Sequence, residues 1–146
     1  MKVLFICTGN TCRSPMAEGI LRKIAQDKGL NVISSSAGIF ANTGEPAAGN
    51  AINSLADMGI DIREHRSQGA EKVIIDSSDL ILTMTSSHRD ILISKYPDKK
   101  YKIFLLNEYA FGKAKDIQDP FGGDQHIYDR ARDEIFYAIK KIYEHN

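Results

Sequence analysis

Cysteine is scarce in this sequence: Cys7 and Cys12 are the only two, and they lie close together. A secreted disulfide scaffold uses more cysteines at wider spacing, so that class of protein is excluded. Long apolar runs are also missing, since no stretch approaches the roughly 18 apolar residues of a membrane span. The opening run, residues 3–6, is too short for a signal peptide. We therefore predict a soluble, cytoplasmic protein that does not associate with membranes.

An excess of charge of either sign is absent as well. Lys and Arg together number 19, Asp and Glu together number 19, and the formal net charge is zero. A balanced chain has no global attraction to nucleic acid or to an anionic membrane, so any binding of anions has to be local. The 146 residues are enough for one domain with its own core, which needs no structural metal. We predict a single domain over residues 1–146, without metal or cofactor; the sequence does not determine its oligomeric state.

Short β-prone runs alternate with helical patterns along the chain. Strands are predicted at residues 3–6, 32–35, 80–84 and 103–106, and a polar, glycine-rich stretch follows from residue 107 to 124. Helices are predicted from Pro15 to Gly29, over residues 46–58, and toward Tyr96 from a cap at Ser86 or Ser87. A last helix is predicted at the end of the chain, where Ile127, Ala131, Ile135, Ile139 and Ile142 would face inward. This alternation predicts a three-layer α/β fold with a four-stranded parallel sheet and helices on both faces. It does not determine the order of the strands.

The segment between the first strand and the first helix has the composition of a phosphate-binding loop. It comprises Cys7, Thr8, Gly9, Asn10, Thr11, Cys12, Arg13 and Ser14. In open α/β sheets, ligands bind at the carboxyl ends of the strands, where this segment lies. Gly9 and Asn10 tolerate left-handed backbone angles, so the loop can curl and direct its N–H groups inward. The following helix points its positive N-terminus at the same place.

Two residues of this loop are suited to chemistry on phosphorus. Arg13 lies six positions after Cys7, where its guanidinium can grip two oxygens of a tetrahedral anion. The same positive surroundings favour the thiolate of Cys7 as a nucleophile. The spacing alone is weak evidence, but its position between a strand and a helix that starts with proline makes it specific. The alternative, a small buried cysteine that ends a strand, leaves Arg13 and the loop glycine unexplained.

The segment from Cys7 to Glu18 resembles the active-site signature of the low-molecular-weight protein tyrosine phosphatase family. Further landmarks that resemble the family are Ser36-Ala37-Gly38, Gly59-Ile60-Asp61 followed by His65, and Asp119-Pro120. The resemblance implies a flavodoxin-like fold with a four-stranded sheet. It also implies metal-free hydrolysis in two steps, in which Cys7 takes the phosphoryl group and water then releases it.

The resemblance further implies that Asp119 protonates the leaving group and later activates water. A positioned acid of this kind is typically worth about 10²–10⁴-fold in rate. Asp119 precedes Pro120 in the glycine-rich stretch after the fourth strand, which also emerges at the carboxyl edge of the sheet. The alternative is a turn aspartate, because Asp-Pro is a common turn pair. Asp116 and Asp124 are nearby rivals that no proline follows.

Several polar residues are candidates for supporting roles. Ser14 can donate its hydroxyl proton to the Cys7 thiolate and also cap the first helix, and Asn10 can hold the loop through side-chain hydrogen bonds. The resemblance implies that Ser36 and His65 brace the loop. The alternatives are a strand-end hydroxyl for Ser36 and a surface histidine for His65. His88 is predicted to face solvent or to cap a helix.

Two positions depart from the pattern of the tyrosine phosphatases. Thr11 stands where those enzymes usually carry a branched aliphatic residue, and Phe121-Gly122-Gly123 follows Asp119-Pro120, where they usually have tyrosine. Thr11 together with Asp-Pro-Phe-Gly-Gly resembles the protein-arginine phosphatases of Gram-positive bacteria. That resemblance implies phosphoarginine in proteins as the substrate.

The chemistry of the two side chains agrees with such a substrate. The Thr11 hydroxyl can make polar contact with a guanidinium, whereas an aromatic ring would leave it unpaired. Phe121 could flank the aliphatic stem of phosphoarginine. The alternatives are a turn threonine that is neutral to specificity and a core aromatic that anchors its loop.

Cys12 has a separate interpretation. It neighbours Cys7 in the curled loop, so a reversible disulfide could protect the nucleophile from over-oxidation and switch the enzyme off. The alternative is a buried thiol that packs the loop.

Three other functions compete with a protein-arginine phosphatase that acts on phosphorylated proteins. The first is a protein tyrosine phosphatase of the same family. The second is a thioredoxin-coupled arsenate reductase, but such enzymes need further cysteines downstream and this chain has none after Cys12. The third is a binding module without catalysis, against which the joint presence of Cys7, Arg13 and Asp119 argues.

Overall fold

The computed structural model describes residues 1–145 and contains a parallel sheet of four strands. The strands are β1 (Lys2–Cys7), β2 (Ile33–Gly38), β3 (Leu80–Thr83) and β4 (Ile103–Leu105). Their order is β2-β1-β3-β4, and all three pairings are parallel. The loop that follows β1 therefore starts in the middle of the carboxyl edge of the sheet, with the ends of β2 and β3 on either side.

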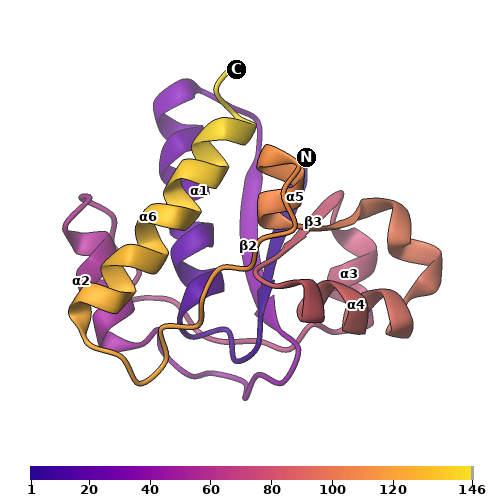
Figure 1. The fold of residues 1–146 in the computed structure, drawn as a ribbon, viewed down its shortest axis with the longest axis horizontal. Coiled ribbons are helices and arrows are strands. Elements are labelled where there is room, and N and C mark those ends of the chain that lie inside the picture. Colours follow the sequence, from indigo (N-terminus) through magenta and orange to yellow (C-terminus); the bar gives the residue numbers. More distant parts are fainter. Residues whose placement is uncertain (146) are drawn as a thin grey trace.

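Helices cover both faces of the sheet, as Figure 1 shows. One side carries α1 (Arg13–Lys28), α2 (Gly49–Ala56) and α6 (Gln125–Ile142), and the other carries α3 (Lys72–Ser77) and α4 (Ser86–Lys95). The 3-10 helix η1 (Pro97–Lys102) follows α4, and α5 (Leu106–Phe111) follows β4. The predicted three-layer α/β class is confirmed.

Side chains of β1 alternate between the two halves of the core. Val3, Phe5 and Cys7 belong to the apolar cluster shared with α1 and α6, while Leu4 and Ile6 belong to the second cluster. This alternation is the two-residue period of a strand that is buried on both faces. Cys7 is the last residue of β1, so its side chain lies on the α1 side, beside the N-terminus of that helix.

The predicted helix caps were wrong at two places. The first helix begins at Arg13, and the residue that precedes it is Cys12, so Ser14 lies inside the helix and does not cap it. Its hydroxyl is instead engaged by Cys7 and Asn10. Helix α4 is capped by Thr85, whose hydroxyl accepts from the N–H of His88 at 3.1 Å, rather than by a serine.

Other differences concern short elements and helix ends. Helix α5 occupies the start of the stretch that was predicted to be irregular, and β4 therefore ends at Leu105. Helix α3 was not predicted because six residues are too few to show a helical period. The predicted helix over residues 46–58 is shorter, and Ile127 was wrongly placed inside, since its side chain is exposed in the first turn of α6.

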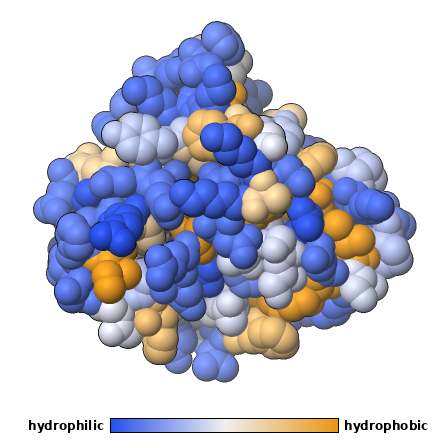
Figure 2. Space-filling view, viewed as in Figure 1, coloured by the Kyte–Doolittle hydropathy of each residue, from blue (hydrophilic) through white to orange (hydrophobic). Residues whose placement is uncertain are grey.

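The face drawn in Figure 2 is mainly hydrophilic, and its apolar residues form several separate groups. Among residues 1–145, no helix is both long enough and apolar enough to cross a membrane.

Candidate active site

The loop after β1 turns back on itself at Asn10. Asn10 has a backbone φ of 57°, in the left-handed region that this residue type tolerates. Gly9 does not adopt a positive φ, so the turn of the loop depends on Asn10. Non-glycine residues in the left-handed region need support from their surroundings, and asparagine tolerates the region better than most residues.

Four neighbours supply that support to Asn10. Its side-chain amide donates to Ser14 Oγ at 2.8 Å and to Ser36 Oγ at 2.9 Å. Its Oδ1 accepts from the backbone N–H of Gln68 at 3.0 Å, and its carbonyl accepts from His65 Nε2 at 2.7 Å. Ser36 and His65 therefore contact the loop, as the resemblance implied for residues that brace it. Gln68 is a further partner of the loop, which the sequence analysis did not identify.

The sulfur of Cys7 is buried next to a hydroxyl. Cys7 Sγ lies 2.9 Å from Ser14 Oγ. Because Ser14 Oγ already accepts a hydrogen bond from Asn10, its own proton is free to be donated to the sulfur. A donor in this position stabilises a thiolate, the form of cysteine that attacks electrophiles.

Arg13 is buried, and one of its N–H groups is unused. Its Nη1 donates to the carbonyl of Ile117 at 2.9 Å, which fixes the plane of the guanidinium. Its Nε is buried, and no hydrogen-bond acceptor for it exists among the described residues. Buried donors nearly always have a partner. This unused donor, on a cation that lines the pocket, is suited to an oxygen of a bound anion.

Asp119 reaches the same pocket from the segment between α5 and α6. Its Oδ2 lies 3.7 Å from Arg13 Nη2, and its side chain is about half exposed. Its Oδ1 accepts from the N–H of Phe121 at 3.1 Å, so Asp119 also forms the turn that the alternative interpretation expected. The two rivals have structural partners: Asp116 accepts from the N–H of Ser86, and Asp124 caps α6.

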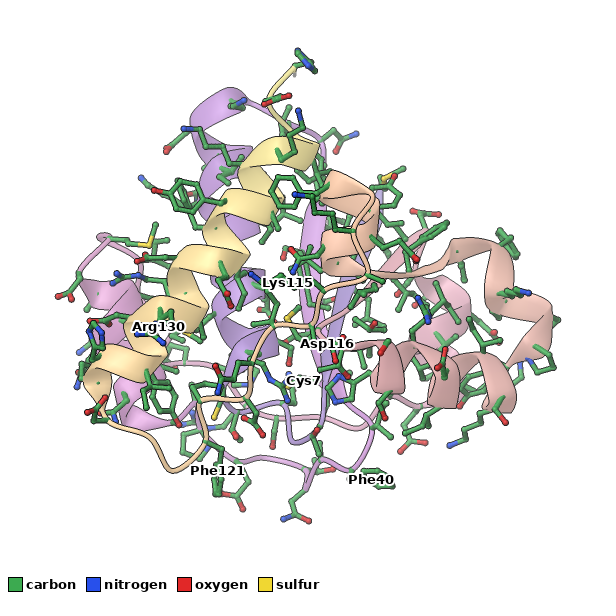
Figure 3. The ribbon with its side chains drawn as sticks, viewed as in Figure 1. Cys7, Phe40, Lys115, Asp116, Phe121 and Arg130 are labelled. Atoms are coloured by element: carbon green, nitrogen blue, oxygen red, sulfur yellow. The ribbon has the colours of Figure 1, made fainter. Side chains whose placement is uncertain are left out.

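These residues enclose a pocket of about 250 Å³. It is lined by Cys7, Thr8, Gly9, Thr11, Cys12, Arg13, Asp119 and Phe121. Phe121 is 77% exposed, which excludes the alternative of a core aromatic. Figure 3 shows Cys7 nearer the middle of the molecule, whereas Phe121 and a second exposed aromatic residue, Phe40, lie nearer the edge of the molecule. Sequence reasoning did not single out Phe40, whose N–H bonds to the carbonyl of Thr8.

The prediction that His88 faces solvent or caps a helix was wrong, since Thr85 caps α4. His88 is 6% exposed, and its Nε2 lies 2.8 Å from the hydroxyl of Thr8. Burial and the positive charge of Arg13 lower the pKa of His88 to about 4. The two partners are 80 positions apart and meet because β1 and β3 are neighbours, which the sequence did not determine.

Cys12 is buried against the last helix. Its Sγ lies 3.3 Å from the hydroxyl of Tyr128, and burial raises the pKa of the Cys12 thiol. Both cysteines are free. The packing role foreseen for Cys12 is present, and the regulatory disulfide with Cys7 stays a prediction.

No three His, Cys, Asp or Glu side chains of residues 1–145 converge in the way that a metal site requires.

Gly38 leaves no room for a side chain behind the loop, and it was not among the predicted site residues. It pairs with Cys7 in the sheet, and a Cβ on Gly38 would lie 2.6 Å from the carbonyl oxygen of Thr8 and 2.9 Å from the N atom of Asn10. Both are backbone atoms, so the loop itself would have to move.

We expect Gly38→Ala to lower the free energy of unfolding by roughly 1–3 kcal/mol and to weaken the binding of inorganic phosphate. Thermal denaturation and titration calorimetry measure the two effects. Gly49→Ala is the matched control, because a Cβ at Gly49 meets nothing within 4 Å. If Gly38→Ala behaved like this control in both measurements, the close packing behind the loop would contribute neither to the stability of the fold nor to phosphate binding.

Comparisons with known proteins agree with this geometry. Residues 2–145 match the family described as low molecular weight phosphotyrosine protein phosphatase. The chain is 40% identical to the protein-arginine-phosphatase of Bacillus subtilis (strain 168), over 97% of this chain and 94% of that relative. It is 38% identical to the low molecular weight protein-tyrosine-phosphatase PtpB of Staphylococcus haemolyticus, over 97% of each chain.

Among solved structures, a YwlE mutant from Bacillus subtilis superposes with a TM-score of 0.95 at 39% identity, covering 99% of this chain and 97% of that one. A YwlE arginine phosphatase that is a cysteine-to-serine mutant with a phosphorylated active-site serine superposes with a TM-score of 0.96 at 39% identity. That match covers 99% of this chain and 94% of the other. With these matches and a cysteine, an arginine and an aspartate in one pocket, the chain belongs to the low-molecular-weight phosphotyrosine protein phosphatase family.

Proposed function

We propose that this protein hydrolyses phosphoarginine in phosphorylated proteins, with Cys7 as nucleophile, Arg13 as phosphate ligand and Asp119 as general acid and base. The observation that carries the choice of substrate is Thr11, which places a hydroxyl-bearing side chain in the wall of the pocket. The relative from Bacillus subtilis, named as a protein-arginine-phosphatase, supports the same choice.

In the first step, the sulfur of Cys7 attacks phosphorus. The S–P bond forms and the P–N bond breaks, while the leaving guanidine nitrogen takes a proton from Asp119. The unused N–H of Arg13 and the N–H groups of the loop bind the phosphoryl oxygens. Ser14, 2.9 Å from the sulfur, stabilises the thiolate before the attack.

In the second step, Asp119 takes a proton from a water molecule, whose oxygen attacks phosphorus. The S–P bond breaks, inorganic phosphate leaves, and the thiolate is restored. The half-exposed position of Asp119 lets it meet both the leaving group and water. A relative with a phosphorylated active-site serine supports a covalent phosphoryl intermediate of this kind.

Selectivity follows from the partners that the substrate finds in the pocket. A guanidinium brings several N–H donors, and both the hydroxyl oxygen of Thr11 and the carbonyl oxygen of the protonated Asp119 side chain can accept from them. A phenyl ring offers no such donors, so a tyrosine substrate would leave the Thr11 hydroxyl without a partner. Phe121, exposed at the pocket, is placed to lie along the aliphatic stem of the arginine.

We expect Thr11→Ile to move the preference from phosphoarginine toward phosphotyrosine by about 10-fold or more in the ratio of the two kcat/KM values. Isoleucine removes the polar partner of the guanidinium and adds apolar contact for a ring. Parallel assays on a phosphoarginine protein and a phosphotyrosine peptide measure the ratio. Thr43→Ile is the matched control, because Thr43 is exposed and does not line the pocket.

Two results would count against this proposal. A clear preference of the unmodified enzyme for phosphotyrosine would reject phosphoarginine as the substrate. An unchanged ratio in Thr11→Ile would remove Thr11 as the selector.

Protein tyrosine phosphatase is the second candidate function, and the 38% identical relative PtpB favours it. With either substrate the partners would be phosphorylated proteins. The cytoplasmic location stays a prediction, which the two free thiols support because reducing compartments keep cysteines unpaired.

A further inference from the structure

Thr8 and His88 form a polar contact at the edge of the pocket that the proposed mechanism does not use. Thr8 follows the nucleophile directly, lines the pocket and is exposed. His88 is buried in the first turn of α4. The 2.8 Å contact between Thr8 Oγ1 and His88 Nε2 therefore connects the pocket wall to a side chain that solvent does not reach.

The surroundings of His88 determine which ring nitrogen carries the proton. Its Nδ1 is buried and has no hydrogen-bond partner among the described residues. A neutral imidazole has one N–H, and a buried N–H without an acceptor is costlier than an unused lone pair. The proton therefore belongs on Nε2, where it is donated to the Thr8 hydroxyl oxygen.

Burial and the positive charge of Arg13 keep the His88 ring neutral. Arg13 of α1 opposes a second positive charge, while Asp116 and Asp119, from the segment between α5 and α6, partly offset this effect. Burial acts in the same direction as Arg13 and is the larger cause of the pKa of about 4. The ring therefore stays a fixed hydrogen-bond donor at neutral pH.

We propose that His88 is a positioning residue that holds the Thr8 hydroxyl at the pocket, and that Thr8 is a second polar selector beside Thr11. When Nε2–H donates to Thr8, the hydroxyl keeps one lone pair for the substrate. This lone pair accepts from a guanidinium N–H, a donor that p-nitrophenyl phosphate lacks. This inference rests on phosphoarginine as the proposed substrate.

Nitrogen NMR of the ligand-free protein tests the tautomer without any substrate. In protein labelled with 15N-histidine, the ring signals that disappear in His88→Gln belong to His88. We expect the Nε2–H tautomer at pH 7, unchanged at pH 5.5. The Nδ1–H tautomer, or protonation of this ring near pH 6.5, would overturn the assignment of His88 as a fixed donor.

Kinetics test whether His88 acts through Thr8. We expect Thr8→Val to lower kcat/KM for a phosphoarginine protein by about 5–10-fold, the worth of one hydrogen bond, while kcat/KM for p-nitrophenyl phosphate changes much less. His88→Leu should show the same selective loss. His88→Gln should retain most of the activity, since its amide can replace Nε2–H. The double variant Thr8→Val/His88→Leu should lose no more than Thr8→Val alone.

Equal losses on both substrates, or losses that multiply in the double variant, would show a merely structural role and overturn the proposal. If His88→Leu does not fold, His88→Phe takes its place in these measurements, because a phenyl ring keeps the planar shape of the side chain and has no N–H to donate to Thr8. Failure of the proposed function is recognised separately: the unmodified enzyme would then prefer phosphotyrosine, whatever the tautomer of His88.

Discussion

Replacing Cys7 by serine is expected to reduce the turnover of phosphorylated substrates by at least about 10³-fold, because removing a nucleophile disables every later step. A serine hydroxyl is a much weaker nucleophile than a thiolate, because it stays protonated at neutral pH. The fold should survive, since a serine hydroxyl fits the space of the sulfur and can still bond to Ser14. Steady-state kinetics and thermal denaturation measure the two expectations.

Cys12→Ser is the matched control for this experiment. Cys12 also lines the pocket, but its sulfur contacts the hydroxyl of Tyr128, and a serine can keep that contact. We expect this variant to retain most of the activity. Substantial turnover by Cys7→Ser, or an equal loss in both variants, would be incompatible with Cys7 as the attacking group.

Replacing Asp119 by asparagine is expected to lower kcat/KM for a phosphoarginine protein by about 10²–10⁴-fold, the usual contribution of a general acid. Asparagine keeps the oxygen that accepts from the N–H of Phe121, so the turn should persist while the proton donor is lost. The loss should be smaller for p-nitrophenyl phosphate, because nitrophenolate is a stable anion that leaves without protonation. The difference between the two substrates is the measurement that identifies a proton donor.

Asp116→Asn provides the control for Asp119. Asp116 lies three positions earlier, and its oxygen accepts from the N–H of Ser86 at the start of α4, a bond that asparagine preserves. The Asp116→Asn variant should be nearly as active as the unmodified enzyme. An Asp119→Asn enzyme that lost kcat/KM equally on both substrates would point to a role in binding rather than in protonation of the leaving group, since kcat/KM does not include the second step that both substrates share.

The phosphate-binding loop could be predicted because it is local. Cys7, Asn10 and Arg13 lie within seven positions between a strand and a helix, and a strand-to-helix turn restricts where such side chains can point. The alternation of apolar runs was likewise sufficient for the α/β class, since strands that alternate with helices form parallel sheets. Asp119 was found through the resemblance to a family, because its pairing with Arg13 spans most of the chain.

The sequence by itself therefore determined the α/β class and the loop from Cys7 to Arg13, and its resemblance to a family added the candidate acid Asp119. Only the tertiary structure decided the strand order, and with it the contact of His88 with Thr8 and the packing of Gly38 behind the loop. The physical reason is that periodicity reports which side of an element is buried, but not which element covers it. Contacts between distant segments depend on how the strands are ordered, and that order is decided only when the whole core packs.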